Sequence, residues 1–238
     1  LIFNAGTNPP DGLVVQYYLS EAPEGDISLT FLDAEGNTIR TYPNPDDPGA
    51  KQPPAKAGLN RFVWNLRYPG ATPVAAPDLE PWARDDGPRI VPGRYQVRLT
   101  VGDVSQTQPF EVVLDPRVTT SAEDLAEQRD FLLEVRDRLS ATNELVNQVD
   151  SVRDQLKLWS TRDLDPAISS QINELSATLD GMRAELIDVR WGGPQLWPTG
   201  VHEKLGAILE SADSADFAPP QQAREVYEQL SAQLDDLR

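Results

Sequence analysis

The sequence changes its character at Asp115-Pro116. Before this point, short runs of β-branched and aromatic residues alternate with turns rich in proline and glycine. After it, apolar residues recur at helical spacing over long stretches. Because a period-two pattern suits strands and a period near 3.6 suits helices, a single uniform architecture is excluded. We therefore expect an α+β chain of two modules, residues 1–117 and residues 118–238.

The first module is predicted to be built from about six short strands. Residues 94–101 alternate apolar and polar side chains, and Gly102-Asp103 then supplies a two-residue hairpin turn. The other strand-like runs are residues 13–19, 27–31, 38–42, 58–67 and 104–114. Short strands joined by short turns are typical of an antiparallel β-sandwich of immunoglobulin type.

Tryptophans in predicted loops are the candidate ligand-binding residues. Residues 67–92 form a stretch rich in Pro, Ala and Asp that contains Trp82, and Trp191 and Trp197 follow the second predicted helix. Sugar sites use such rings as stacking platforms beside a few polar groups. Trp82 could equally pin its loop to the sandwich, because burial of one aromatic ring is strongly favourable.

The second module is predicted to be an antiparallel bundle of three to four helices. Thr120 and Glu123 form a capping box at the start of the first helix. Two interleaved rows repeat every seven residues along this helix: Leu125, Leu132, Leu139 and Val146, and Gln128, Val135, Thr142, Val149 and Leu156. Such rows are typical of a bundle or coiled-coil seam.

Three further helices follow, each with its own apolar stripe. The second begins at Asp165-Pro166, the third after Thr199 and the fourth at Pro219-Pro220. The stripe of the second helix comprises Ile168, Ile172, Leu175, Leu179, Met182, Leu186 and Val189; the later stripes comprise Val201, Leu205, Ile208 and Leu209, then Ala223, Val226, Leu230, Leu234 and Leu237. The stripes form an intramolecular core, or the second one is an interaction seam for a partner helix or a second copy.

Charge and composition exclude several classes of partner and chemistry. The net charge is −17, which repels nucleic acid and anionic membranes. No apolar run approaches the roughly 20 residues of a membrane helix, so we expect no membrane insertion. The absence of cysteine removes disulfides, thiol nucleophiles and Cys-ligated metals.

No catalytic constellation is recognisable either. His202 is the only histidine, which excludes a histidine metal cluster, and no Gly-x-Ser-x-Gly elbow or glycine-rich phosphate loop is present. We interpret His202 as a surface or loop-packing residue early in the third helix. We expect no catalytic residues, no metal and no cofactor, and therefore a chain that is not itself an enzyme.

Three sequence runs carry a family resemblance: Pro9-Pro10-Asp11-Gly12, residues 58–70 with the core Gly-Leu-Asn-Arg-Phe-Val-Trp, and residues 91–101 with Pro-Gly-Arg-Tyr. Together with the helical part beginning at Asp115, they resemble the C-terminal region of bacterial sortilin-like β-propeller proteins, the VPS10 type with BNR repeats, often labelled glycosyl hydrolases. The resemblance covers nearly the whole chain.

The resemblance implies an exported protein whose propeller lies before Leu1, so that this chain is an excised piece. The Asp-box repeats of such propellers are not found here. We therefore expect a non-catalytic accessory or scaffold module that docks onto the upstream propeller or a protein partner. Two alternatives remain: a carbohydrate-binding module that uses the loop tryptophans, with a polysaccharide as partner, and a helical oligomerisation module.

Overall fold

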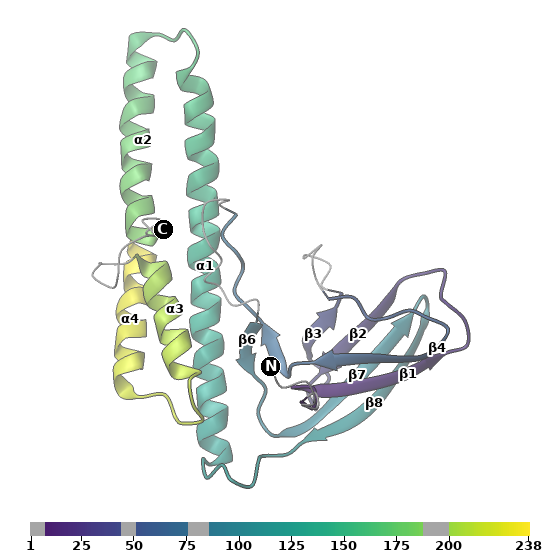
Figure 1. The fold of residues 1–238 in the computed structure, drawn as a ribbon. Helices are drawn as coiled ribbons and strands as arrows, with labels where there is room; N and C mark the ends of the chain where they lie inside the picture. The colour runs from purple at the N-terminus through teal and green to yellow at the C-terminus, as the bar shows by residue number, and fades with distance from the viewer. Residues whose placement is uncertain (1–7, 44–50, 76–85, 188–199) are drawn as a thin grey trace, which may run out of the picture. The chain divides into compact units, whose positions relative to one another are not determined.

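A computed structural model describes residues 8–43, 51–75, 86–187 and 200–238. The described chain is α+β, with antiparallel strands followed by helices (Figure 1). It divides into two compact units. The strand unit comprises Leu1–Pro69 and Arg89–Thr119, and the helical unit comprises Gly70–Pro88 and Thr120–Arg238. The described residues 70–75 and 86–88 therefore group with the helices, whereas the sequence-based boundary placed them in the first module.

Two of the three described sheets, one of four strands and one of two, form the core of the strand unit. The strands are β1 (Leu13–Leu19), β2 (Ile27–Leu32), β3 (Thr38–Tyr42), β4 (Gly58–Trp64), β5 (Arg67–Pro69), β6 (Asp86–Arg89), β7 (Gly93–Val101) and β8 (Val104–Val112). One of these two sheets has the order β3-β2-β7-β8 and the other pairs β1 with β4; the third sheet pairs the short strands β5 and β6. The six longer strands match the predicted runs closely, but β5 and β6 lie in a stretch that was predicted to be one loop.

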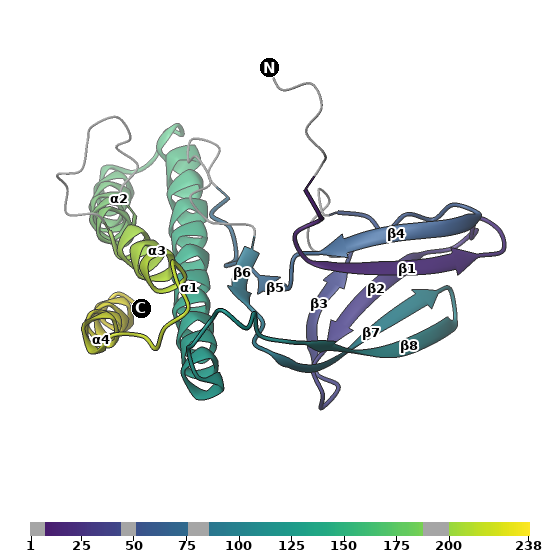
Figure 2. The same ribbon diagram turned by 60° about the horizontal axis from the view of Figure 1, so that its bottom comes forward.

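Both sheets contribute side chains to one aromatic core. Phe31 from β2 stacks on Trp64 from β4 with ring centroids 4.1 Å apart, and Tyr42 from β3 lies 4.9 Å from Phe62. All four residues are buried, as the alternation along each strand predicts. Figure 2 shows the β1–β4 pair lying over the β2–β7 part of the larger sheet.

Four helices make up the rest of the described helical unit: α1 (Ala122–Ser160), α2 (Pro166–Leu186), α3 (Val201–Ala212) and α4 (Gln221–Asp236). The first half of α1 packs against α3 and α4, and its middle contacts the end of α2 (Figure 1). The predicted rows on α1 are confirmed as buried from Leu125 to Val149, while Leu156 is only half-buried.

Two local predictions were wrong by one residue. The N-cap of α1 is Ser121, whose Oγ accepts the backbone N–H of Asp124, so Thr120 is not the cap. Thr120 instead donates from Oγ1 to the carbonyl of Asp216. In α4, Val226 is exposed and Tyr227 packs in the core, because a stripe of alternating four- and three-residue steps runs through 227.

Candidate functional site

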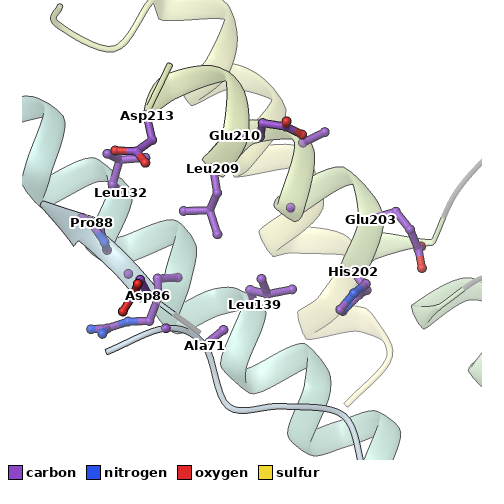
Figure 3. A pocket seen from close by; sticks show the side chains of 15 residues that line it. Ala71, Asp86, Pro88, Leu132, Leu139, His202, Glu203, Leu209, Glu210 and Asp213 are labelled. Atoms are coloured by element: carbon purple, nitrogen blue, oxygen red, sulfur yellow. The ribbon is translucent and has the colours of Figure 1, made fainter. Parts of the chain in front are cut away.

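A pocket of about 350 Å³ lies within the helical unit. Its walls come from the first half of α1, from the exposed side of α3, and from short stretches of chain at 70–71 and 86–88 (Figure 3). A volume of this size falls within the range of small-molecule sites. No sequence pattern predicts it, because its walls are brought together only by the tertiary fold.

The pocket has an aliphatic interior. Leu132 and Leu139 come from α1, Leu209 from α3 and Ala71 from the extended stretch. Figure 3 shows Leu209 of α3 extending toward Leu139 of α1. Gly206 leaves additional room, because a Cβ built there would meet nothing within 4 Å. Apolar groups of a ligand would therefore exchange water for hydrocarbon contacts here.

The charged side chains around this interior are mostly acidic. Asp86, Glu203, Glu210 and Asp213 line the pocket, and among the described lining residues Arg136 alone carries a positive charge near pH 7. Arg136 is within 2.6 Å of the Asp137 carboxylate, which offsets its charge. The described lining thus carries one positive charge against four negative ones, and this net negative charge favours cations.

The acidic character is concentrated at the C-terminal end of α3. Glu210 lies in the last turn of the helix and Asp213 is the C-cap, while that turn contains no basic residue. Exposed carbonyls already make a helix C-terminus partially negative, so basic side chains are the favourable choice there. The local sequence is therefore poorly suited to helix stability and well suited to attracting a positive charge.

A hydrogen-bond relay positions the extended wall of the pocket. Asn143 of α1 donates through Nδ2 to the carbonyl of Thr72 at 2.7 Å, so its Oδ1 is left to accept from Nδ1 of His202 at 2.6 Å. On either side of Asn143, Ser140 accepts from the N–H of Thr72 and Asn147 accepts from the N–H of Ala75. Polar residues at 140, 143 and 147 lie on one helix face. The spacing of these three polar residues is the sequence feature from which the relay could have been predicted.

His202 is a structural member of this relay, and of the two roles that the sequence left open, a surface position or loop packing, its contact with Asn143 fits loop packing. It lies in the first turn of α3, and burial lowers its pKa from 6.5 to about 4. The imidazole is therefore neutral near pH 7, and its Nδ1–H donates a hydrogen bond to Oδ1 of Asn143. Within the described residues, no group of three or more His, Cys, Asp or Glu could hold a metal ion.

The predicted seam on α2 is only partly buried. Leu186 is fully buried, whereas Ile168 and Leu175 are 48% and 44% exposed. Ile172, Leu179 and Met182 are half-buried, and Val189 lies outside the described residues. Together with the exposed Val152, Leu158 and Trp159 of α1, Ile168 and Leu175 define an exposed apolar surface, which we call the hairpin face.

The candidate sugar-binding tryptophans are not tested by the structure. Trp82, Trp191 and Trp197 all lie outside the described residues. Of the two described tryptophans, Trp64 is completely buried in the strand unit and Trp159 is 48% exposed near the end of α1. The guanidinium of Arg162 covers the Trp159 ring at 4.2 Å from its centroid.

Comparison with known proteins gives no match to a family model, to a curated protein or to a solved structure. In the part of the chain that the structure describes, no helix is both long and apolar enough to span a bilayer.

Proposed function

We propose that the chain is a non-catalytic accessory module of an exported sortilin-like β-propeller protein, and that the hairpin face docks onto another protein surface. In this proposal the strand unit is an immunoglobulin-like β-sandwich and the helical unit is an antiparallel bundle. The resemblance of the sequence to the C-terminal region of sortilin-like proteins supports the parent protein and its export.

Two features support an immunoglobulin-like sandwich. The two sheets share one core, to which Phe31 and Trp64 contribute from opposite sheets. Tyr95 near the start of β7 donates from its hydroxyl to the carbonyl of Val91 at 2.6 Å. A tyrosine that bonds back to the backbone a few residues upstream is similar to the tyrosine corner of immunoglobulin-like domains.

The observation that carries the docking proposal is the uncovered end of the α1–α2 hairpin. The buried cores that involve α3 and α4 extend along α1 only from Phe131 to Val149, so the residues beyond Val149 have only α2 as a described helical neighbour. Several exposed apolar side chains on one pair of helices are the kind of surface that protein interaction sites use. Trp159, near the end of α1, is among these exposed side chains, which fits the enrichment of aromatic residues in interface cores.

The charge distribution supports a protein partner. Residues 151–178 contain three basic and four acidic residues, for a net charge of −1, although the whole chain carries −17. The hairpin face can thus meet a neutral apolar surface without the repulsion that the rest of this acidic chain would cause.

Site-specific photo-crosslinking in the full parent protein would test this proposal. A photoreactive phenylalanine analogue would replace Leu158, which is 67% exposed on the hairpin face. Val104, at 72% exposure in the strand unit, provides a control of matched exposure and polarity. We expect the Leu158 position to crosslink at high yield to one defined surface and the Val104 position to give only a diffuse background.

The mapped crosslink would also identify the occupant. A crosslink to the propeller or to a different protein supports the accessory role. A crosslink to residues of the hairpin face in a second copy favours the oligomerisation alternative, in which two hairpins complete a four-helix arrangement. Equal, diffuse crosslinking from both positions would contradict docking through this face.

A further inference from the structure

We propose that the pocket between α1 and α3 binds a small organic cation with an aliphatic body, of the alkylammonium class. The pocket is separate from the hairpin face, so ligand binding there does not depend on whether that face docks onto a protein. The proposed ligand class follows from the shape of the pocket, the chemistry of its interior and the sign of the charge around it.

The interior selects for an aliphatic ligand. Among the described residues, the apolar side chains that form it are leucines, alanines and Pro88, and none of the described lining residues is a phenylalanine, tyrosine or tryptophan. Sugars and flat aromatic ligands bind best against aromatic platforms, which the described lining does not include. Flexible hydrocarbon of moderate length would fill about 350 Å³ and reach the space beside Gly206.

The rim selects for a positive charge. Glu210 and Asp213 stand at the partially negative end of α3, and Asp86 and Glu203 add two carboxylates from other parts of the lining. An ammonium head placed there would interact with carboxylates next to a low-dielectric interior, where charge interactions are stronger than in bulk water. A carboxylate head would meet repulsion in the same position.

The negative charge of Glu210 is unfavourable for the helix that carries it. A helix generally gains stability from basic residues in its last turn, and α3 has none. Positions where local preference and observed residue disagree are often functional. Recognition of a cation gives Glu210 a role that helix stability does not.

Titration of the chain with three ligands of equal length would test this inference. The ligands are n-octylammonium, n-octanol and n-octanoate, each kept below its aggregation threshold and followed by calorimetry or ligand-observed NMR. We expect saturable binding of n-octylammonium, weaker binding of n-octanol and no measurable binding of n-octanoate. Because an exposed head group is screened by salt, the preference for the ammonium should shrink as ionic strength rises.

Variants of the pocket would locate the binding. Gly206→Leu fills the space beside α3 and should weaken n-octylammonium binding about tenfold or more. Gly206→Ala adds a single methyl group where nothing lies within 4 Å, so it should fold and weaken binding to a smaller degree. This second variant keeps the test decisive if the leucine disturbs folding.

The charge requirement has its own pair of variants. Glu210→Gln should weaken n-octylammonium severalfold and leave n-octanol unchanged, whereas Glu228→Gln, an exposed acid in α4, should change neither. Equal affinities for the three ligands would overturn the inference. So would unchanged n-octylammonium binding in both Gly206 variants, since the ligand would then bind elsewhere, for example on the hairpin face.

Discussion

The two units of this chain use their large side chains differently. The strand unit closes its core with aromatic rings in contact, as between Phe31 and Trp64. The helical unit packs mainly aliphatic side chains in two clusters, and it has both a pocket beside Leu139 and an exposed hairpin face. The strand unit thus uses its large side chains for interior packing, whereas the helical unit leaves some of them at a pocket and on an exposed face. Both proposed binding sites therefore lie in the helical unit.

The largest expected effect comes from the two tryptophans that represent this contrast. Trp64→Ala removes a fully buried ring from the strand unit, and such truncations cost about 3–5 kcal/mol of stability. Trp159→Ala removes a half-exposed ring from the hairpin face and should cost less than about 1 kcal/mol. Urea unfolding should be followed by near-ultraviolet circular dichroism for the aromatic core and at 222 nm for the helices. Comparable losses in the two variants would break the contrast between the units.

The second prediction concerns pH and involves only the helical unit, because His202 is the sole histidine. Burial lowers its pKa from 6.5 to about 4, so between these values the unfolded chain binds more protons than the folded one. Stability is therefore fully present above pH 6.5 and falls as the pH drops toward 4. The slope is at most about 1.4 kcal/mol per pH unit, and the total at most about 3 kcal/mol.

A variant isolates this contribution from the carboxylates that titrate in the same range. In His202→Gln the slope of helical-unit stability against pH between 6.5 and 5 should be shallower than in the wild type. Chemical unfolding at a series of pH values, read at 222 nm, gives both slopes. Parallel curves for the two proteins would mean that His202 is accessible to protons in the folded state, and the relay through Asn143 would lose its support.

The third prediction concerns the start of α3, where the helical unit is closely packed. Gly200 caps α3, and a Cβ there would lie 2.6 Å from backbone atoms of Leu186 and Ile187. Gly200→Ala should therefore destabilise the unit by about 1–3 kcal/mol, since backbone must move. Gly181 in α2 has open space around it, and Gly181→Ala should stabilise by up to about 1 kcal/mol. Thermal unfolding of both variants should show shifts of opposite sign; a neutral Gly200→Ala would contradict close packing at this point.

Local patterns in the sequence predicted much of the fold. Alternation located the six longer strands, and the seven-residue rows on α1 identified its buried face from Leu125 to Val149. The predictions were wrong where two adjacent residues suit the same structural role about equally well. Thr120 and Ser121 can both cap a helix, and Val226 and Tyr227 are both apolar, so tertiary packing decided between them.

The candidate site was far less predictable. The pocket joins a stretch near Ala71 to α3 residues more than a hundred positions later, and no periodicity relates them. The relay through His202 was not predicted, because its partner Asn143 lies on another helix. On α2, periodicity indicated which residues share a face, but the extent to which neighbouring helices cover that face depends on helix lengths and packing.

The smallest predicted effect tests whether the acidic end of α3 weakens the helix that carries it. Glu210→Gln removes an exposed negative charge from the last turn and should raise stability by a few tenths of a kcal/mol at low salt. Screening should reduce this gain at high salt, and Glu228→Gln in the middle of α4 should show little effect under either condition. Thermal unfolding of the two variants at two salt concentrations would measure it. If Glu210→Gln lowers stability, the carboxylate supports the fold and there is no reason to assign it to a ligand. A gain in stability together with weaker n-octylammonium binding is the result expected for a recognition residue.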